Sequence, residues 1–264
     1  MSQPLSKNSG FLKAGFPLLW IILVGIWGGC ATALDPVDNA VLAREKFREA
    51  VELGSINMRE KQIAALKEAI GLAQEDPEYR AHLGGAYLQD GQFEQAEKEF
   101  LDILNIDKRY KTAYHFLGQL AMRKQNWEKA VEYFSEELKL PGAVSPHQVY
   151  NWLALSYYNL GRIKMAEQEW KNAIHIKDHA GIRLNLALLY KNQEQFARAM
   201  ESLKKAVVLN PKFHQAHYEI ALLYLREKKM NRAITHFERA VRLDPKSTQA
   251  EASREYLNLL RQGK

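Results

Sequence analysis

The sequence predicts an all-α protein, a solenoid of about six helix–turn–helix units, and two observations support this prediction. Residues 43–247 repeat one pattern about every 34 residues, and a fixed period in this range is typical of stacked helical repeats. Within each unit, apolar residues recur at helical spacing at positions 7, 8 and 11 and again at positions 17, 20, 24 and 27. We therefore expect each unit to form two amphipathic helices.

Two positions in each unit differ consistently in size. Position 8 is small and position 24 is large, and position 20 is Ala in every unit except the first, which has Gln62. Because protein interiors are close-packed, we expect each large side chain to fill the space beside a small one. The small residues are Ala50, Gly84, Gly118, Ala154, Ala187 and Ala221, and the large ones are Leu66, Phe100, Phe134, Trp170, Leu203 and Phe237.

Turn signals and a capping signal mark the limits of the helices. Gly91 and Gly161 fall between the two predicted helices of their units, where a turn is required. After the last unit, Thr248 and Glu251 have the spacing of a capping box. Residues 248–264 are therefore expected to form a helix that caps the end of the array and keeps it soluble.

This period and residue pattern resemble the tetratricopeptide (TPR) repeat. The resemblance implies a TPR superhelix in which the first helix of each unit lines a concave surface through positions 2, 5, 9 and 12. In the third unit these positions are Thr112, His115, Gln119 and Met122. The predicted units are 43–76, 77–110, 111–144, 147–179, 180–213 and 214–247, with a short insertion at 140–146 between the third and the fourth.

The same positions of the fourth to sixth units predict a partner groove. Their apolar members would form a contiguous strip, which on an uncovered surface marks a binding site. Neighbouring asparagines could pair with the backbone of a bound peptide. The alternative is that these side chains touch one another as packing within a tight superhelix. The apolar members are Leu155, Tyr158, Leu184, Leu188, Tyr218, Leu222 and Leu225, and the asparagines are Asn151, Asn159, Asn185 and Asn192.

No catalytic, cofactor-binding or metal-binding motif occurs in the sequence, so we expect a protein that is not an enzyme. The pairs His175 with His179 and His214 with His217 have metal-ligand spacing, but they fall near turns between units and no third ligand joins them. They are interpreted as exposed turn histidines. The adjacent pair Glu136-Glu137 is interpreted as part of a solvated helix face.

The N-terminal segment predicts export. Two lysines precede an apolar run at residues 16–27, and Gly28, Gly29 and Cys30 follow, which is the layout of a secretory signal. The segment resembles a bacterial lipoprotein signal, and that resemblance implies cleavage after residue 29 and lipidation of Cys30. It further implies an outer membrane lipoprotein on the periplasmic side, with residues 30–42 as the linker to the repeats.

A membrane anchor that is not cleaved is the alternative. Residues 14–34 carry no charge and are long enough to cross a bilayer as a helix, which would fix the chain in the inner membrane. The lysines before this run would keep its N-terminal end in the cytoplasm, so the repeats would be exported in either case. Association with the membrane, through a lipid or through this helix, is thus expected on both interpretations.

The partner is expected to be a protein. The net charge of +6 is small, and the Lys and Arg residues are dispersed without a basic stripe, so nucleic acid is not an expected ligand. An exported lipoprotein made of TPR units resembles the type IV pilus pilotins of the PilF, PilW and Tgl type. That resemblance implies a scaffold that helps a secretin subunit to assemble. An adaptor for another envelope process and a subunit of an enzyme with a cryptic site remain open, and so does the oligomeric state.

Overall fold

The structure is a computed structural model, and it describes residues 36–142 and 145–262. Over these residues it contains thirteen α-helices and no strand, which confirms the predicted all-α repeat fold. The predicted signal segment, Cys30 and the candidate anchor lie outside the described residues. Within the described residues, no helix has the length and apolar character needed to cross a membrane.

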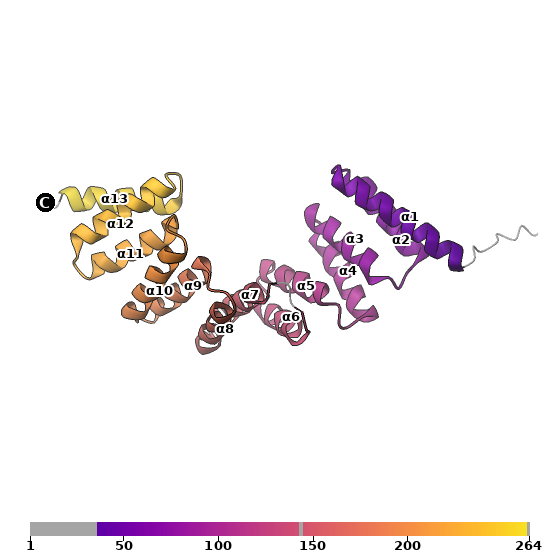
Figure 1. Cartoon of the computed structure of the whole chain (residues 1–264), viewed down its shortest axis with the longest axis horizontal. Helices are drawn as coiled ribbons and strands as arrows, with labels where there is room; N and C mark the ends of the chain where they lie inside the picture. Colours follow the sequence, from indigo (N-terminus) through magenta and orange to yellow (C-terminus); the bar gives the residue numbers. More distant parts are fainter. Residues whose placement is uncertain (1–35, 143–144, 263–264) are drawn as a thin grey trace, which may run out of the picture. The chain divides into compact units, whose positions relative to one another are not determined.

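The helices follow one another as pairs, and the two helices of a pair pack against each other (Figure 1). Each second helix also contacts the first helix of the next pair, and the last helix packs against both helices of the sixth pair. The helices are α1 (Pro36–Ser55), α2 (Arg59–Leu72), α3 (Pro77–Gln89), α4 (Phe93–Ile106), α5 (Lys111–Arg123), α6 (Trp127–Lys139), α7 (Pro146–Asn159), α8 (Ile163–Ile176), α9 (Ala180–Asn192), α10 (Phe196–Leu209), α11 (His214–Arg226), α12 (Met230–Leu243) and α13 (Thr248–Gln262).

Two boundaries differ from expectation. Helix α1 begins at Pro36 and so includes part of the expected linker at residues 30–42; proline suits the first turn of a helix because the amide there has no helical partner. Helix α13 begins at Thr248, but the residue that caps it is Ser247, whose Oγ accepts a hydrogen bond from the Ala250 amide at 3.2 Å. The expected capping box at Thr248 is therefore wrong by one residue.

The predicted contact between small and large residues occurs in the second and third pairs of helices. Phe100 and Phe134 are completely buried, and each ring lies against the glycine at position 8 of the same unit. A Cβ added to Gly84 would lie 2.8 Å from the Phe100 ring, and one added to Gly118 would lie 2.5 Å from the Phe134 ring. Both distances are shorter than van der Waals contact, so glycine is needed at these two positions.

All six turns within the pairs use the same backbone geometry. The residue at position 15 of each unit has a positive φ between 56° and 75°. Glycine adopts this conformation without strain, but other residues do so at a cost of about 1 kcal/mol or more. Sequence reasoning found the two glycine turns and missed the other four, three of which have residues that give no turn signal (Gln125, Glu194 and Lys228). The six residues are Asn57, Gly91, Gln125, Gly161, Glu194 and Lys228.

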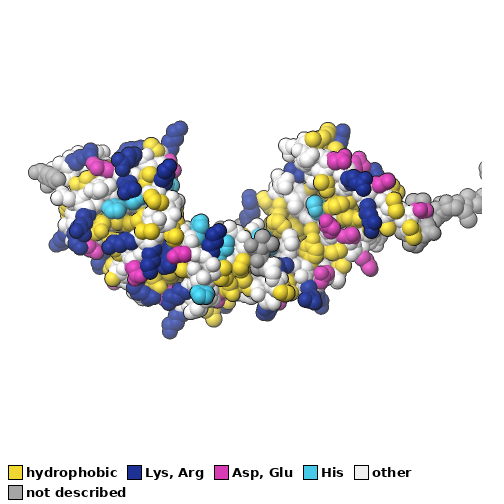
Figure 2. Space-filling view, in the orientation of Figure 1, with side chains coloured by type: hydrophobic (Ala, Val, Ile, Leu, Met, Phe, Trp, Pro, Cys, Tyr) yellow, Lys and Arg dark blue, Asp and Glu magenta, His cyan; other side chains and the backbone are white. Residues whose placement is uncertain are grey.

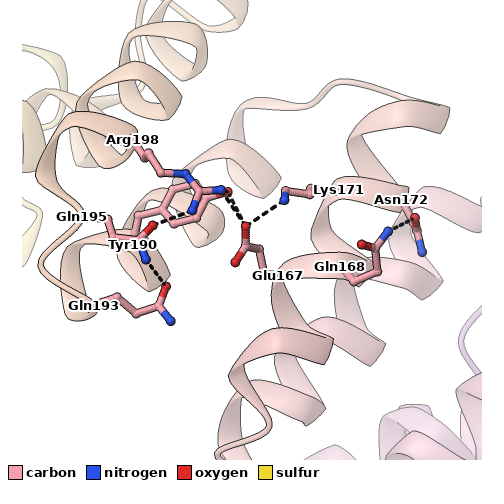
Figure 3. Close-up of polar contacts among 8 residues, drawn as sticks. All are labelled: Glu167, Gln168, Lys171, Asn172, Tyr190, Gln193, Gln195 and Arg198. Carbon is pink, nitrogen blue, oxygen red and sulfur yellow. Dashed lines mark hydrogen bonds and ion pairs between the residues drawn. The ribbon is translucent and has the colours of Figure 1, made fainter.

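A polar cluster joins the fourth and fifth pairs (Figure 3). Glu167 of α8 accepts hydrogen bonds from the Tyr190 hydroxyl at 3.0 Å and from Arg198 at 2.7 Å, and it forms an ion pair with Lys171 at 2.8 Å. The Arg198 guanidinium also lies 3.9 Å from the centre of the Tyr190 ring. Burial, together with the hydrogen bond to Glu167, raises the pKa of Tyr190 to about 12. The cluster fixes α9 and α10 against α8.

The neighbouring glycines of α3 give a first prediction. Replacing Gly84 by alanine forces a methyl group against the buried Phe100 ring, and we expect a loss of about 1 to 3 kcal/mol of folding free energy. Gly85→Ala is the control, because a Cβ there meets nothing within 4 Å. It should stabilise the helix by about 0.5 to 1 kcal/mol. Urea unfolding measures both variants, and changes of the same sign would contradict the packing described.

The polar cluster gives a second prediction. Tyr190→Phe removes a hydrogen bond to a charged group while keeping the ring, and we expect a loss of about 1 to 2 kcal/mol of folding free energy. Tyr157→Phe is the matched control, since the Tyr157 hydroxyl has no hydrogen-bond partner among the described residues. Equal unfolding midpoints for the two variants in urea would show that the cluster contributes nothing to stability.

Candidate functional site

A row of cavities runs along the first helices of successive pairs. Four cavities have volumes of about 610, 310, 300 and 180 Å³, and each shares lining residues with the next. Thr112 and Phe116 line the first two, Gln148 lines the second and third, and Asn185 lines the third and fourth. We call this row the first-helix groove. It extends from α3 to α11, so it begins two pairs earlier than the predicted partner groove.

The first cavity lies between α3 and α5 and is the largest of the four. Ala81, His82 and Gly85 of α3 line one side, and Thr112 and Phe116 of α5 line the other. Gly85 adds no side chain to the wall, which leaves the backbone of α3 open to the cavity. The expected groove in the fourth to sixth units did not include this region.

The second cavity contains a buried carboxylate. Glu137 of α6 is only 4% exposed, so the expectation that it belongs to a solvated face is wrong; its neighbour Glu136 is half-buried and pairs with Lys139 at 2.6 Å. The Nδ1 atom of His115 lies 3.0 and 3.2 Å from the two carboxylate oxygens of Glu137. The Nε2 atom of His115 lies 3.1 Å from the Gln119 amide nitrogen. His115 and Glu137 both line this cavity.

One signal in the sequence could have revealed Glu137. It stands at position 27 of the third unit, a position that recurs as apolar. The other five units have Ala69, Ile103, Ala173, Ala206 and Ala240 there, and all five are completely buried. A charged residue at a core position of a repeat is therefore a better indicator of a site than the apolar residues that keep the pattern.

The third and fourth cavities contain most of the predicted groove residues. Asn151, Leu184 and Asn185 line the third, and Leu155, Tyr158, Asn185, Leu188 and Asn192 line the fourth. The asparagines are already engaged with the protein. The Asn151 side-chain oxygen accepts from the Trp170 indole at 2.9 Å and from Asn185 at 3.0 Å, and Asn192 donates to the Tyr158 hydroxyl. Asn159 is exposed and donates to the Leu155 carbonyl at 2.8 Å.

The remaining predicted residues lie at the C-terminal end. Tyr218, Leu222 and Leu225 are half-buried and pack against the cluster formed by Ala221, Ala233, Phe237 and Leu257. Leu184 is 8% exposed, and Leu155, Tyr158 and Leu188 are half-buried against the core of the fourth to sixth pairs. The strip thus takes part in packing within the array, while its members from α7 and α9 also form the walls of open cavities.

Two histidines outside the groove, one buried and one half-buried, form a pair. His217 of α11 is 2% exposed, so the expectation of an exposed turn histidine is wrong for this residue, while His175 and His179 are exposed. The Nδ1 atoms of His217 and His236 lie 3.0 Å apart, and Nε2 of His217 lies 3.2 Å from the Pro211 carbonyl oxygen. Within the described residues, no group of three or more His, Cys, Asp and Glu is placed to hold a metal.

Protonation of this histidine pair is disfavoured. Burial, with the charges of His217 and Arg239 nearby, lowers the pKa of His236 to about 4. Burial also lowers the pKa of His217, against the opposite effect of its hydrogen bond to Pro211. The Tyr224 ring lies 5.6 Å from the His236 ring, and the Arg232 guanidinium lies over the Tyr224 ring, 5.6 Å from its centre.

The pair predicts acid sensitivity. A histidine in the unfolded chain has a pKa of about 6.5, so the unfolded state binds more protons than the folded state as the pH falls below that value. The contribution of the neutral histidine pair to the free energy of unfolding should therefore be fully present above pH 7 and should be lost as the pH falls from about 6.5 to about 4. His236→Gln should flatten this decline in melting temperature, whereas the control His175→Gln, at an exposed site, should leave it unchanged. An unaltered decline in His236→Gln would contradict the assignment.

Comparison with known proteins identifies the repeats. The tetratricopeptide repeat family matches at residues 77–110, 117–176 and 184–248, which together exceed half of the 264 residues. No curated protein sequence matches the chain.

Several solved structures share the fold. PilF of Pseudomonas aeruginosa is 13% identical, with a TM-score of 0.67 over 83% of this chain and 99% of that one. PilW, described as a widely conserved type IV pilus biogenesis factor, is 14% identical, with a TM-score of 0.66 over 80% and 97%. YrrB, described as a TPR protein with an unusual peptide-binding site, is 17% identical, with a TM-score of 0.59 over 72% and 98%. At these identities the likeness establishes the fold alone.

Proposed function

The chain belongs to the tetratricopeptide repeat family, and from that premise we propose that it is a non-enzymatic scaffold whose first-helix groove binds a segment of another protein. The observation that carries the proposal is the continuity of the groove. Its cavities adjoin one another from α3 to α11 through shared lining residues, which suits an extended or helical segment better than a compact small molecule. Half-buried apolar walls beside polar side chains suit such a segment.

The process that we propose is the assembly of a type IV pilus secretin in the bacterial envelope. Three observations support it: the signal-like N-terminal sequence that ends in Cys30, the six TPR units, and the likeness in fold to PilF and PilW. On this proposal the chain is held at the outer membrane by a lipid on Cys30, or at the inner membrane by an uncleaved helix. The repeats would then lie in the periplasm, and the bound partner would be a secretin subunit.

The groove is tested by capture of partners from envelope extracts. Leu188→Glu places a charge in the wall of the fourth cavity, and Gln148→Trp adds bulk at an exposed position between the second and third. We expect each variant to capture at most one tenth of the amount of partner that the wild type captures. Val208→Glu is the control, because it introduces the same charge on α10 at a side chain that is 78% exposed.

Helix content and melting temperature must match the wild type before the groove variants are interpreted, since a charge in a packed array can also unfold it. If folded variants retain every partner, the groove is not the binding surface. The process is tested separately in cells that lack the gene. We expect them to contain secretin monomers in place of multimers; normal multimers would leave the scaffold proposal intact and contradict the pilus assignment.

A further inference from the structure

We propose that the cavity between α5, α6 and α7 is a subsite for a basic side chain, with the Glu137 carboxylate receiving the ammonium group of a lysine or the guanidinium group of an arginine. The inference deepens the proposed function, because it names the chemistry of the segment that the first-helix groove would hold. It rests on that function only for the source of the basic side chain. The cavity and its charge exist independently of it.

The first argument is the cost of the carboxylate. Glu137 replaces an alanine or isoleucine that is completely buried at the same position of every other unit. Burying a carboxylate is unfavourable unless its charge is compensated, and an apolar residue would have served the packing as well or better. A charge retained at such a position requires another explanation, and a ligand of opposite charge supplies one.

The second argument is that no lysine or arginine pairs with this carboxylate among the residues that the structure describes. His115 is the residue that hydrogen-bonds the Glu137 side chain in the described part of the chain. The Nε2 atom of His115 accepts a hydrogen bond from the Gln119 amide nitrogen, which leaves Nδ1 as the protonated nitrogen that donates to Glu137. A bond to this one nitrogen leaves the Glu137 carboxylate most of its capacity to accept hydrogen bonds.

The third argument is the shape and lining of the cavity. It has a volume of about 310 Å³ and is open to solvent through the groove, so that a side chain can enter from a segment lying there. Phe116 lines the same cavity as Glu137 and offers an aromatic surface to a cation. Thr112, Ser145 and Gln148 add neutral groups that can accept hydrogen bonds from an ammonium or guanidinium group.

The one basic residue in the lining is already engaged. Lys111 stands at the rim, and its ammonium group donates to the carbonyl of Pro141 in the insertion at 140–146. That contact ties the insertion to the start of α5, and the same insertion supplies Ser145 to the cavity. Ser145 of the insertion thus forms part of the subsite.

The net charge of the part of the chain around the subsite has the same negative sign as the Glu137 carboxylate. Residues 36–144 contain 19 acidic and 15 basic residues, a net charge of −4, whereas residues 145–264 contain 11 acidic and 20 basic residues, a net charge of +9. On the face drawn in Figure 2, Lys and Arg cover much of the surface over α9 to α13, whereas Asp and Glu are frequent over α1 to α4. A segment with a basic end over the second cavity and an acidic end over the later units matches this division.

The subsite is tested with a small probe. The probe is Nα-acetyl-arginine amide, and the control is Nα-acetyl-citrulline amide, which has the same shape and no charge. Binding to the full chain is followed by NMR shifts of the His115 ring, which lines this cavity, and of the Trp152 ring, which lines the third cavity 5.0 Å from the His115 ring. We expect saturable shifts with the arginine compound and at least tenfold weaker binding of the citrulline compound. Equal binding of the two, or no binding of either, overturns the subsite.

Two variants assign the effect to the carboxylate. Glu137→Gln removes the charge with little change of shape, and Glu137→Ala restores the residue that four other units have at this position, so it is expected to fold. Both should weaken binding of the arginine compound at least tenfold at an unchanged or higher melting temperature. If Glu137→Gln binds the probe as the wild type does, the proposal is wrong. Glu136→Gln, one residue away on the outer face of α6, is the matched control and should bind normally.

The same variants separate this inference from the proposed function. If Glu137→Gln loses the probe while Leu188→Glu and Gln148→Trp retain every partner, the subsite stands and the groove scaffold fails. If Leu188→Glu loses the partner while Glu137→Gln keeps both the partner and the probe, the scaffold stands and the subsite fails. Loss of probe and partner together by Glu137→Gln supports both.

Discussion

The fit of a large side chain against a small residue between the two helices of a pair is the contact on which the rest of the structure depends. Phe100 against Gly84 and Phe134 against Gly118 show it most clearly, because each ring occupies the volume that a β-carbon would need. The close approach sets the distance between the two helices of a pair. The first helices are thereby held at a regular spacing, and the cavities of the groove lie between them.

Much of the fold could be predicted because the same pattern occurs in several units, so that an ambiguous residue in one unit is clarified by the others. A single alanine or phenylalanine carries little information, but the same residue types at positions 8, 20 and 24 of several units predict the pairing of helices. The turns were harder, since Gln125, Glu194 and Lys228 adopt a left-handed conformation that their residue types do not favour. Packing on both sides of the turn imposes that geometry, and packing cannot be inferred from the turn residues themselves.

The candidate site was predicted less well than the fold, for a related reason. The apolar groove residues were chosen because they occupy the first-helix positions that line the concave surface in the family. In this structure, however, Tyr218, Leu222 and Leu225 pack within the array. The Asn151 side-chain oxygen accepts hydrogen bonds from Asn185 and Trp170, and residue spacing alone does not reveal these bonds. Glu137 was assigned to a solvated face because it stands next to Glu136 on a predicted helix among lysines, yet it is buried. Its position within the repeat was the better guide to its burial.

The order of contacts along the chain has a mechanical consequence. Nearly all substantial contacts join helices that follow each other in the sequence, and α13 on α11 is the main exception among the described residues. Among the described residues, substantial contacts therefore join each unit mainly to its immediate neighbours, which stabilise it. A load applied along the chain would therefore extend it by releasing one pair of helices after another from an end, while the pairs that remain folded keep their part of the groove.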